Sequence, residues 1–144
     1  MKEELIWALV FDYPHVFVGA RRKYENASFQ GISCGEGWEP IVRWLSAGIE
    51  RLIEQEPEDE REFYRCIEVR ERFGGLEFYM NDATPEMARL VRVAVSQSFS
   101  MCEFCGNPGA LRQDGRRGAK TLCDSCRGKV VVLPLTGQVP APLV

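Results

Sequence analysis

Hydrophobic residues recur at helical spacing in two long segments of the chain. From about Pro40 to Glu56 the apolar positions fall on one helical face, with a proline in the first turn and Pro57 just past the end. A second helix is predicted to begin at Thr84-Pro85, because threonine is a good N-cap and proline fits the first helical position. Its apolar face continues to Phe99, so this helix is expected to lead directly into Cys102.

Between these helices the hydrophobic pattern changes to a period of two. Apolar and polar residues alternate over residues 63–70 and again over residues 76–80, on either side of Gly74-Gly75. This arrangement predicts two antiparallel strands joined as a hairpin. The acidic stretch 56–62 that precedes them is expected to be a solvated loop.

The remaining segments give weaker patterns. Residues 2–12 fit a short helix, although a strand is nearly as well supported for so short an apolar run. Residues 13–37 contain one proline and four glycines and predict irregular connections. Residues 130–144 carry three prolines and little polarity, as expected of an extended tail. The predicted fold is therefore α+β. A body over residues 1–100 continues into a zinc-ribbon or treble-clef-like module over residues 101–129, and the tail follows.

Composition limits the class of protein. The chain has 144 residues, the size of one domain, and its 45% hydrophobic and 10% aromatic content argues against a disordered chain. A charged N-terminus is followed by only seven apolar residues, Leu5 to Phe11, too few for a signal peptide or a membrane span. We therefore expect a soluble, cytoplasmic protein with no membrane partner.

Four of the six cysteines form the strongest motif in the sequence. Cys102 and Cys105 are separated by two residues, as are Cys123 and Cys126, and seventeen residues lie between the pairs. Two such pairs supply the four thiolates of a structural zinc site, which leaves no coordination position for a reactive water. Redox-active dithiols and an iron–sulfur cluster are the alternatives, and neither has a matching spacing signature here. One structural Zn²⁺ is the expected cofactor.

No other set of residues predicts catalysis. Cys34 has no evident base partner and is interpreted as a buried thiol, and Cys66 as an ordinary cysteine outside the metal site. His15, the single histidine, is interpreted as a loop or core residue. Nucleophile-elbow, Walker and metalloprotease motifs are missing from the sequence. The chain is accordingly expected not to be an enzyme, and no catalytic residues are assigned.

Charge is divided unevenly along the chain. Residues 1–100 carry 12 basic and 18 acidic side chains, whereas residues 101–144 carry 6 basic and 3 acidic side chains. The basic module indicates phosphate or partner contacts, or alternatively a solvated loop whose cations offset thiolate charge. No aromatic residue follows Cys105 to provide a stacking surface for bases. The candidate contact residues are Arg112, Arg116, Arg117, Lys120, Arg127 and Lys129.

A series of short motifs resembles a family of small bacteriophage and prophage proteins with a C-terminal four-cysteine knuckle. The motifs include Cys34-Gly35-x-Gly37-Trp38, the stretch Val69-x-Glu71-x-Phe73-Gly74-x-Leu76-x-Phe78-Tyr79, and the knuckle segment from Cys102-Glu103-x-Cys105-Gly106 to Thr121-Leu122-Cys123-Asp124. Together they cover roughly residues 30–127. The resemblance implies a phage origin and a zinc module, and it assigns no activity and no functional residues beyond the four cysteines.

These observations give two functional expectations. The first is a zinc-binding, phage-type accessory protein that binds a host protein or protein complex without catalysis, for example as an inhibitor of a host defence or regulatory complex. The second is a nucleic-acid-binding regulator that uses the basic zinc module. The sequence leaves the identity of the partner, the oligomeric state, and sequestration of a small molecule open.

Overall fold

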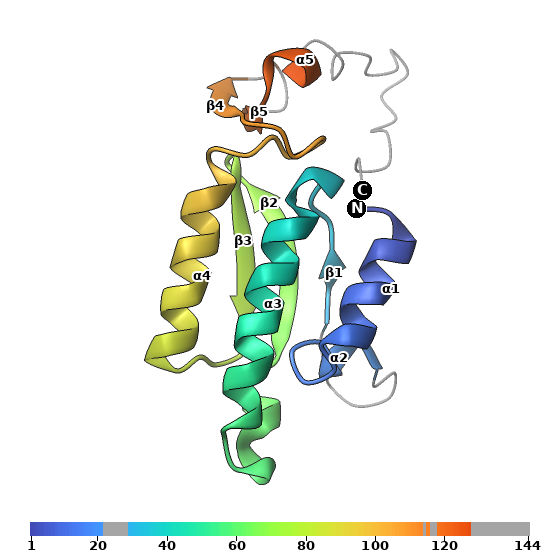
Figure 1. Cartoon of the computed structure of the whole chain (residues 1–144), viewed down its shortest axis with the longest axis vertical. Coiled ribbons are helices and arrows are strands. Elements are labelled where there is room, and N and C mark those ends of the chain that lie inside the picture. The colour runs from blue at the N-terminus through green and yellow to red at the C-terminus, as the bar shows by residue number, and fades with distance from the viewer. Residues whose placement is uncertain (22–28, 114, 116–117, 128–144) are drawn as a thin grey trace.

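The structure confirms a mixed α+β fold. It is a computed structural model and describes residues 1–21, 29–113, 115 and 118–127 (Figure 1). The predicted tail over residues 130–144 lies outside the described residues. So do three of the six candidate basic residues, namely Arg116, Arg117 and Lys129.

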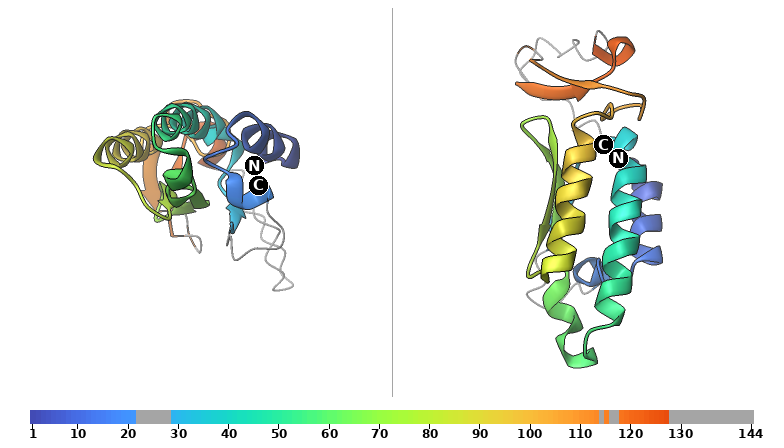
Figure 2. Two further views of the ribbon diagram at one scale, coloured as in Figure 1. Left: turned by 90° about the horizontal axis from the view of Figure 1, so that it is seen from below. Right: turned by 60° about the vertical axis from the view of Figure 1, so that its left-hand side comes forward.

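The body consists of one layer of helices on one three-stranded sheet. The strands are β1 (Gly31–Ile32), β2 (Cys66–Arg72) and β3 (Gly75–Met80), in the order β1-β2-β3. β1 pairs parallel with β2, and β2 pairs antiparallel with β3. Three helices lie side by side over one face of the sheet, as the left view of Figure 2 shows: α1 (Glu3–Asp12), α3 (Glu39–Glu54) and α4 (Pro85–Ser98).

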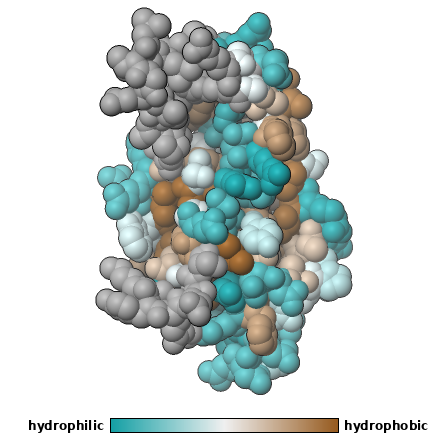
Figure 3. Space-filling model, turned by 180° about the vertical axis from the view of Figure 1, so that it is seen from behind, coloured by the Kyte–Doolittle hydropathy of each residue, from teal (hydrophilic) through white to brown (hydrophobic). Residues whose placement is uncertain are grey.

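The opposite face of the sheet is largely polar. Arg70 on β2 lies 3.1 Å from Glu77 on β3, and Arg72 lies 3.3 Å from the same carboxylate. Figure 3, which views the molecule from behind, shows hydrophilic residues interspersed with hydrophobic ones on this side. A sheet that is buried on one face alternates polar and apolar residues in this way, which accounts for the period of two in the sequence.

The core lies between the helices and the sheet because both contribute a continuous apolar face. The buried side chains include Leu9 and Val10 of α1, Leu45, Ile49 and Ile53 of α3, Val69 and Phe78 of the hairpin, and Met87 and Ala94 of α4. Both long helices begin as predicted. A proline occupies the first turn of each, and the Thr84 side chain accepts a hydrogen bond from the Met87 amide at 3.3 Å.

Local patterns predicted some segments incompletely. Residues 3–12 form a helix, so the strand alternative for this run was wrong. The prediction of wholly irregular structure over residues 13–37 was also wrong, because α2 (Val18–Arg21), β1 and the 3₁₀ turn η1 (Glu36–Trp38) form there. β1 has two residues, too few to show any period, and it exists because it pairs with β2. The expected acidic loop contains a 3₁₀ segment, η2 (Glu58–Tyr64).

The C-terminal elements lie at one end of the body. They are a hairpin of β4 (Ala110–Gln113) and β5 (Ala119–Leu122), followed by the short helix α5 (Asp124–Arg127). In Figure 1 they lie beyond the C-terminal end of α4 and the N-terminal end of α3. Within the described residues, no helix is both long enough and apolar enough to cross a membrane.

The Gly35-x-Gly37-Trp38 segment joins these elements to the body. The Gly37 amide donates to the Glu103 carbonyl oxygen at 2.7 Å, and the buried Trp38 ring nitrogen donates to the Met101 carbonyl oxygen at 2.8 Å. A Cβ atom at Gly37 would lie 2.1 Å from the Cys102 carbonyl oxygen. Glycine is therefore required for the two backbones to approach this closely, and hydrogen bonds cross the predicted boundary at residue 100.

We predict that Gly37→Ala lowers the free energy of unfolding by about 2–3 kcal/mol, because the added methyl group meets backbone atoms that cannot move aside. Gly48→Ala is the matched control. Its methyl group would meet only the Leu90 Cδ1 atom at 2.9 Å, the end of a flexible side chain, and alanine favours the helix by up to about 1 kcal/mol. Chemical denaturation measures both values, and equal losses in the two variants would contradict the proposed close approach.

Candidate metal centre

The four predicted metal-ligating cysteines converge on one point. The sulfur atoms of Cys102, Cys105, Cys123 and Cys126 all lie within 4.8 Å of one another, and those of Cys105 and Cys123 are 3.5 Å apart. Tetrahedral zinc with sulfur ligands at 2.3 Å requires sulfur–sulfur distances of about 3.8 Å. The cluster therefore has the size and the chemistry of a closed site for one metal ion.

The first pair of cysteines is held by a tight turn that follows α4. The Cys102 amide donates to the Asn107 carbonyl oxygen at 2.7 Å, and the Gly106 amide donates to the Cys102 carbonyl oxygen at 2.9 Å. Gly106 has a φ of +80°, a left-handed conformation that suits glycine. These bonds fold the backbone so that both sulfurs of the pair face the second pair.

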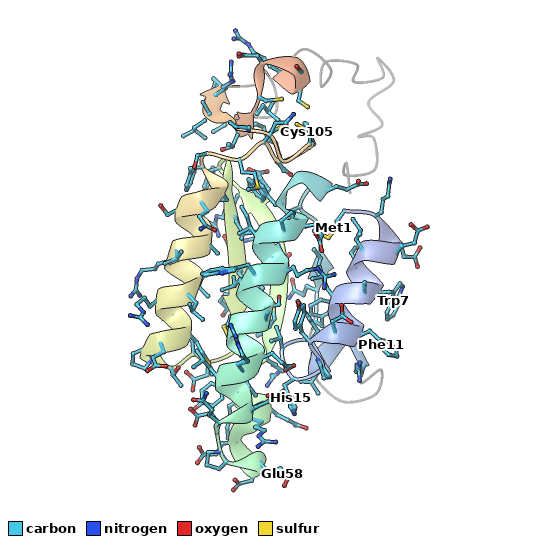
Figure 4. All side chains as sticks on the ribbon, in the orientation of Figure 1. Met1, Trp7, Phe11, His15, Glu58 and Cys105 are labelled. Carbon is cyan, nitrogen blue, oxygen red and sulfur yellow. The ribbon has the colours of Figure 1, made fainter. Side chains whose placement is uncertain are left out.

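The second pair lies where β5 ends and α5 begins. The Cys126 amide lies 3.4 Å from the Cys123 sulfur, and this hydrogen bond is the main cause that lowers the pKa of Cys123 to about 7. Burial raises the pKa of Cys126 to about 12. Three of the four cysteines are buried and Cys105, labelled in Figure 4, is exposed. A metal ion would hold all four as thiolates.

The convergence of all four sulfurs favours a metal site over two separate redox pairs. Two independent dithiols would each keep their own pair of sulfurs, whereas here a sulfur of the first pair lies 3.5 Å from a sulfur of the second. Four thiolates also complete a tetrahedral coordination sphere and leave no position for a water or substrate. A metal ion bound by these four cysteines would therefore have a structural role.

Buried ion pairs connect the centre to the hairpin β2–β3, and sequence analysis missed them. Lys120 of β5 lies 2.5 Å from Glu71 of β2 and 3.3 Å from Glu103. Glu103 is 3% exposed and also accepts a hydrogen bond from the Gly35 amide at 3.1 Å. Nearby, the Thr121 hydroxyl donates to the Gly74 carbonyl oxygen at 2.6 Å. Nothing in the spacing of these residues indicates that they meet, because the contacts depend on the docking of the two parts.

Two of the basic candidate residues have internal partners. Lys120 belongs to the buried ion pairs just described, and Arg112 pairs with Asp124 at 2.7 Å and donates to the Leu122 carbonyl oxygen at 3.1 Å. Arg127 is exposed at the end of α5. Lys120 and Arg112 therefore help to hold the module together. The sequence alone could not distinguish this role from contacts with phosphate.

Cys34 is fully buried, which confirms its interpretation as a buried thiol, and Cys66 is fully buried as well. Burial raises the pKa of Cys34 to about 12 and also raises the pKa of Cys66. A thiol in this state has little thiolate at neutral pH and is a poor nucleophile.

His15 lies in the turn between α1 and α2, where it contacts Glu50 of α3. The buried Glu50 carboxylate accepts hydrogen bonds from the His15 amide at 2.6 Å and the Val16 amide at 3.4 Å, and its other oxygen lies 3.1 Å from His15 Nδ1. Glu54 is close enough to His15 and Glu50 that the three side chains could together hold a metal ion. Because Glu50 satisfies backbone amides of the turn, we assign this group a structural role. His15 is labelled in Figure 4.

We predict that Lys120→Met lowers the free energy of unfolding by about 3 kcal/mol, because it leaves two mostly buried carboxylates without their cation. Arg112→Met is the control from the same hairpin. Its partner Asp124 is 91% exposed, so the loss should be about 1 kcal/mol. Denaturation of the zinc-loaded variants compares the two, and a larger loss for Arg112→Met would refute the importance of the buried pairs.

Comparisons of the chain with family models, with curated proteins and with solved structures give no match. The function is therefore argued from the geometry of this molecule. Its most distinctive feature is the four-cysteine cluster, which is a candidate metal centre docked on an α+β body.

Proposed function

We propose that Cys102, Cys105, Cys123 and Cys126 bind one structural Zn²⁺. Two observations support zinc: the donor set consists of four thiolates, and the distances between them suit tetrahedral coordination. The order of the elements is a cysteine turn, a hairpin, and a helix that carries the last ligand. This order supports a treble-clef-like module, a small metal-dependent unit whose core consists of few apolar residues.

We further propose that the protein acts by binding a host protein without catalysis, as a phage-type accessory protein in the bacterial cytoplasm. The observation that carries this proposal is the attachment of the four-cysteine cluster to the body through Glu103, Lys120 and the Gly37 contact. A metal with four thiolate ligands organises a surface and cannot activate a substrate. Inhibition of a host defence or regulatory complex is the role that the phage resemblance suggests.

Binding of nucleic acid is the second role suggested by the sequence, and the described contacts favour it less. Phosphate binding requires exposed cations that are free to replace counterions. Lys120 is engaged with two carboxylates and Arg112 with Asp124, so the described part of the module offers mainly Arg127. A protein partner is therefore the better supported target.

We predict that the zinc-loaded chain recovers a stoichiometric protein partner from a bacterial host lysate, and that Cys105→Ser recovers much less of it. The substitution removes one ligand from the more exposed side of the centre and should release the metal. Affinity capture followed by mass spectrometry measures the bound protein. The control is Ser125→Ala, which alters an exposed residue between the second pair of cysteines.

Three outcomes separate the alternatives. Capture of a protein by the wild type and Ser125→Ala but not by Cys105→Ser supports the proposal. Recovery of nucleic acid that is released by moderate salt would instead support the regulator. Absence of any stoichiometric partner, or turnover of a substrate that is abolished by a single substitution, would contradict a non-enzymatic binding protein.

A further inference from the structure

The turn of the β2–β3 hairpin contains an aromatic residue in an unfavourable conformation. Phe73 has a φ of +52°, and it is the one non-glycine residue with positive φ in the described part of the chain. Gly74 follows with a φ of +86°, so both central residues of this two-residue turn have the positive φ that a type I′ turn requires. Asparagine, aspartate or glycine is the usual residue at the position that Phe73 occupies.

Burial of the side chain does not offset the energetic cost of the positive φ at Phe73. The Phe73 side chain is 76% exposed, so the energy lost to the left-handed conformation is not recovered by packing. Asparagine would adopt the backbone conformation of this turn position more readily than phenylalanine does. Strained residues of this kind concentrate at functional sites, which directs attention to what surrounds the turn.

The two glycines that follow Phe73 in the chain are each packed against an exposed apolar side chain from another element. Leu111 of β4 is 52% exposed, and its Cδ1 atom would lie 2.3 Å from a Cβ atom at Gly74. Phe99, at the end of α4, is 39% exposed, and its ring would lie 2.4 Å from a Cβ atom at Gly75. The two glycines therefore allow both side chains to pack directly on the turn. We call Phe73, Leu111 and Phe99 the junction patch.

One exposed cation accompanies the junction patch. The Arg72 guanidinium lies 5.4 Å from the centre of the Phe73 ring, and its side chain is 54% exposed. Glu77 is its carboxylate partner at 3.3 Å, but Glu77 lies closer to Arg70, at 3.1 Å, and is shared between the two. Arg70 in addition lies 3.8 Å from Glu68. Arg72 thus retains capacity for a carboxylate supplied from outside.

We propose that the junction patch is the docking surface for a protein segment that combines apolar side chains with a carboxylate. Phe73 would insert into an apolar pocket of the partner, Leu111 and Phe99 would extend the contact, and Arg72 would pair with the acidic group. Aromatic residues and arginine are the side chains that most often dominate binding energy at protein interfaces. This inference rests on the proposed function and names its surface.

The composition of the patch favours protein over nucleic acid. A base could stack on Phe73, but Leu111 offers aliphatic surface that stacking does not use. The nearby Lys120 and Arg112 are engaged in internal ion pairs and are poorly placed to follow a phosphate backbone. An apolar, acidic protein segment uses all three apolar residues and the exposed Arg72 that the structure describes beside them.

The patch also depends on the metal centre. Leu111 belongs to β4, and the hairpin β4–β5 connects the first pair of cysteines to the second. Removal of the metal should free this hairpin and leave Phe73 without Leu111 beside it. A structural metal ion at this site would thereby support the binding of a partner by the junction patch.

The test uses Phe73→Asn in the zinc-loaded full-length chain. Asparagine accepts the left-handed conformation, so we expect the midpoint of thermal unfolding to rise by about 2–5 °C while binding is lost. The probe is a displayed library of random 15-residue peptides selected on the wild type. Enriched peptides should combine aromatic or aliphatic residues with Asp or Glu, and should bind Phe73→Asn at least tenfold more weakly by fluorescence polarisation.

Two further variants give the controls. Phe11→Ala removes another exposed phenylalanine, which lies on α1 and points away from the body in Figure 4, and it should bind the peptides like the wild type. Arg72→Gln should weaken peptides that contain a carboxylate and leave their Asp→Asn or Glu→Gln versions unaffected. A single-stranded thymidine oligonucleotide, tested in parallel, should not bind through Phe73.

Several results would overturn the inference. These are no enrichment of peptides, equal affinity for the wild type and Phe73→Asn, peptides without carboxylates, or oligonucleotide binding that requires Phe73. Affinity capture from lysate shows whether only the proposed docking surface is wrong or whether the proposed function is wrong as well. If a captured partner also binds Phe73→Asn, the protein is a binding protein that uses another surface, whereas recovery of no partner removes the proposed function itself.

Discussion

The structure depends on the close contact between the first cysteine turn and the Gly35–Trp38 segment. Two backbones meet there with no side chain between them, and the carbonyl oxygens of Met101 and Glu103 accept hydrogen bonds from the body. A four-cysteine module of this size buries few apolar residues of its own. Its stability must therefore depend on this contact with the body and, under the proposed function, on the metal ion that the four cysteines would bind.

Charge reinforces the same contact. Glu103 directly follows Cys102, is almost completely buried, and connects Lys120 of the module to an amide of the body. A buried charge destabilises a fold unless it is paired. Any position of the module that separated Glu103 from Lys120 would therefore be less stable than the docked one. The result is a single surface in which the hairpin β2–β3 and the hairpin β4–β5 lie together, with Phe73 and Leu111 exposed at the junction.

Sequence patterns predicted those features that depend on local periodicity or on a fixed spacing of ligands. The two long helices, the central hairpin and the convergence of four cysteines were predicted, because each produces a pattern within a short window. Features that depend on contacts between distant segments were not predicted. β1 forms because it pairs with β2. Lys120 was predicted to contact nucleic acid or a partner, because its internal partners Glu71 and Glu103 are distant in sequence.

Phe73 is a further feature that depends on contacts between distant segments and not on a local sequence pattern. The sequence of the zinc module contains no aromatic residue after its first cysteine pair, and on that basis it lacks a stacking or anchoring side chain. The fold supplies Phe73 from the body, more than thirty residues away in the chain. Its positive φ could have been suspected from the Phe73-Gly74 turn, but its position beside Leu111 could not.

The proposed binding of a single metal ion by the four cysteines can be tested on the intact chain. Native mass spectrometry counts bound metal directly, and hydrogen exchange on the same sample reports the Gly37 amide. We expect one zinc ion per chain, and loss of protection at Gly37 when a chelator removes that ion. A chain that carries no metal, or one in which the protection of Gly37 is unchanged after the zinc is removed, would contradict the proposal.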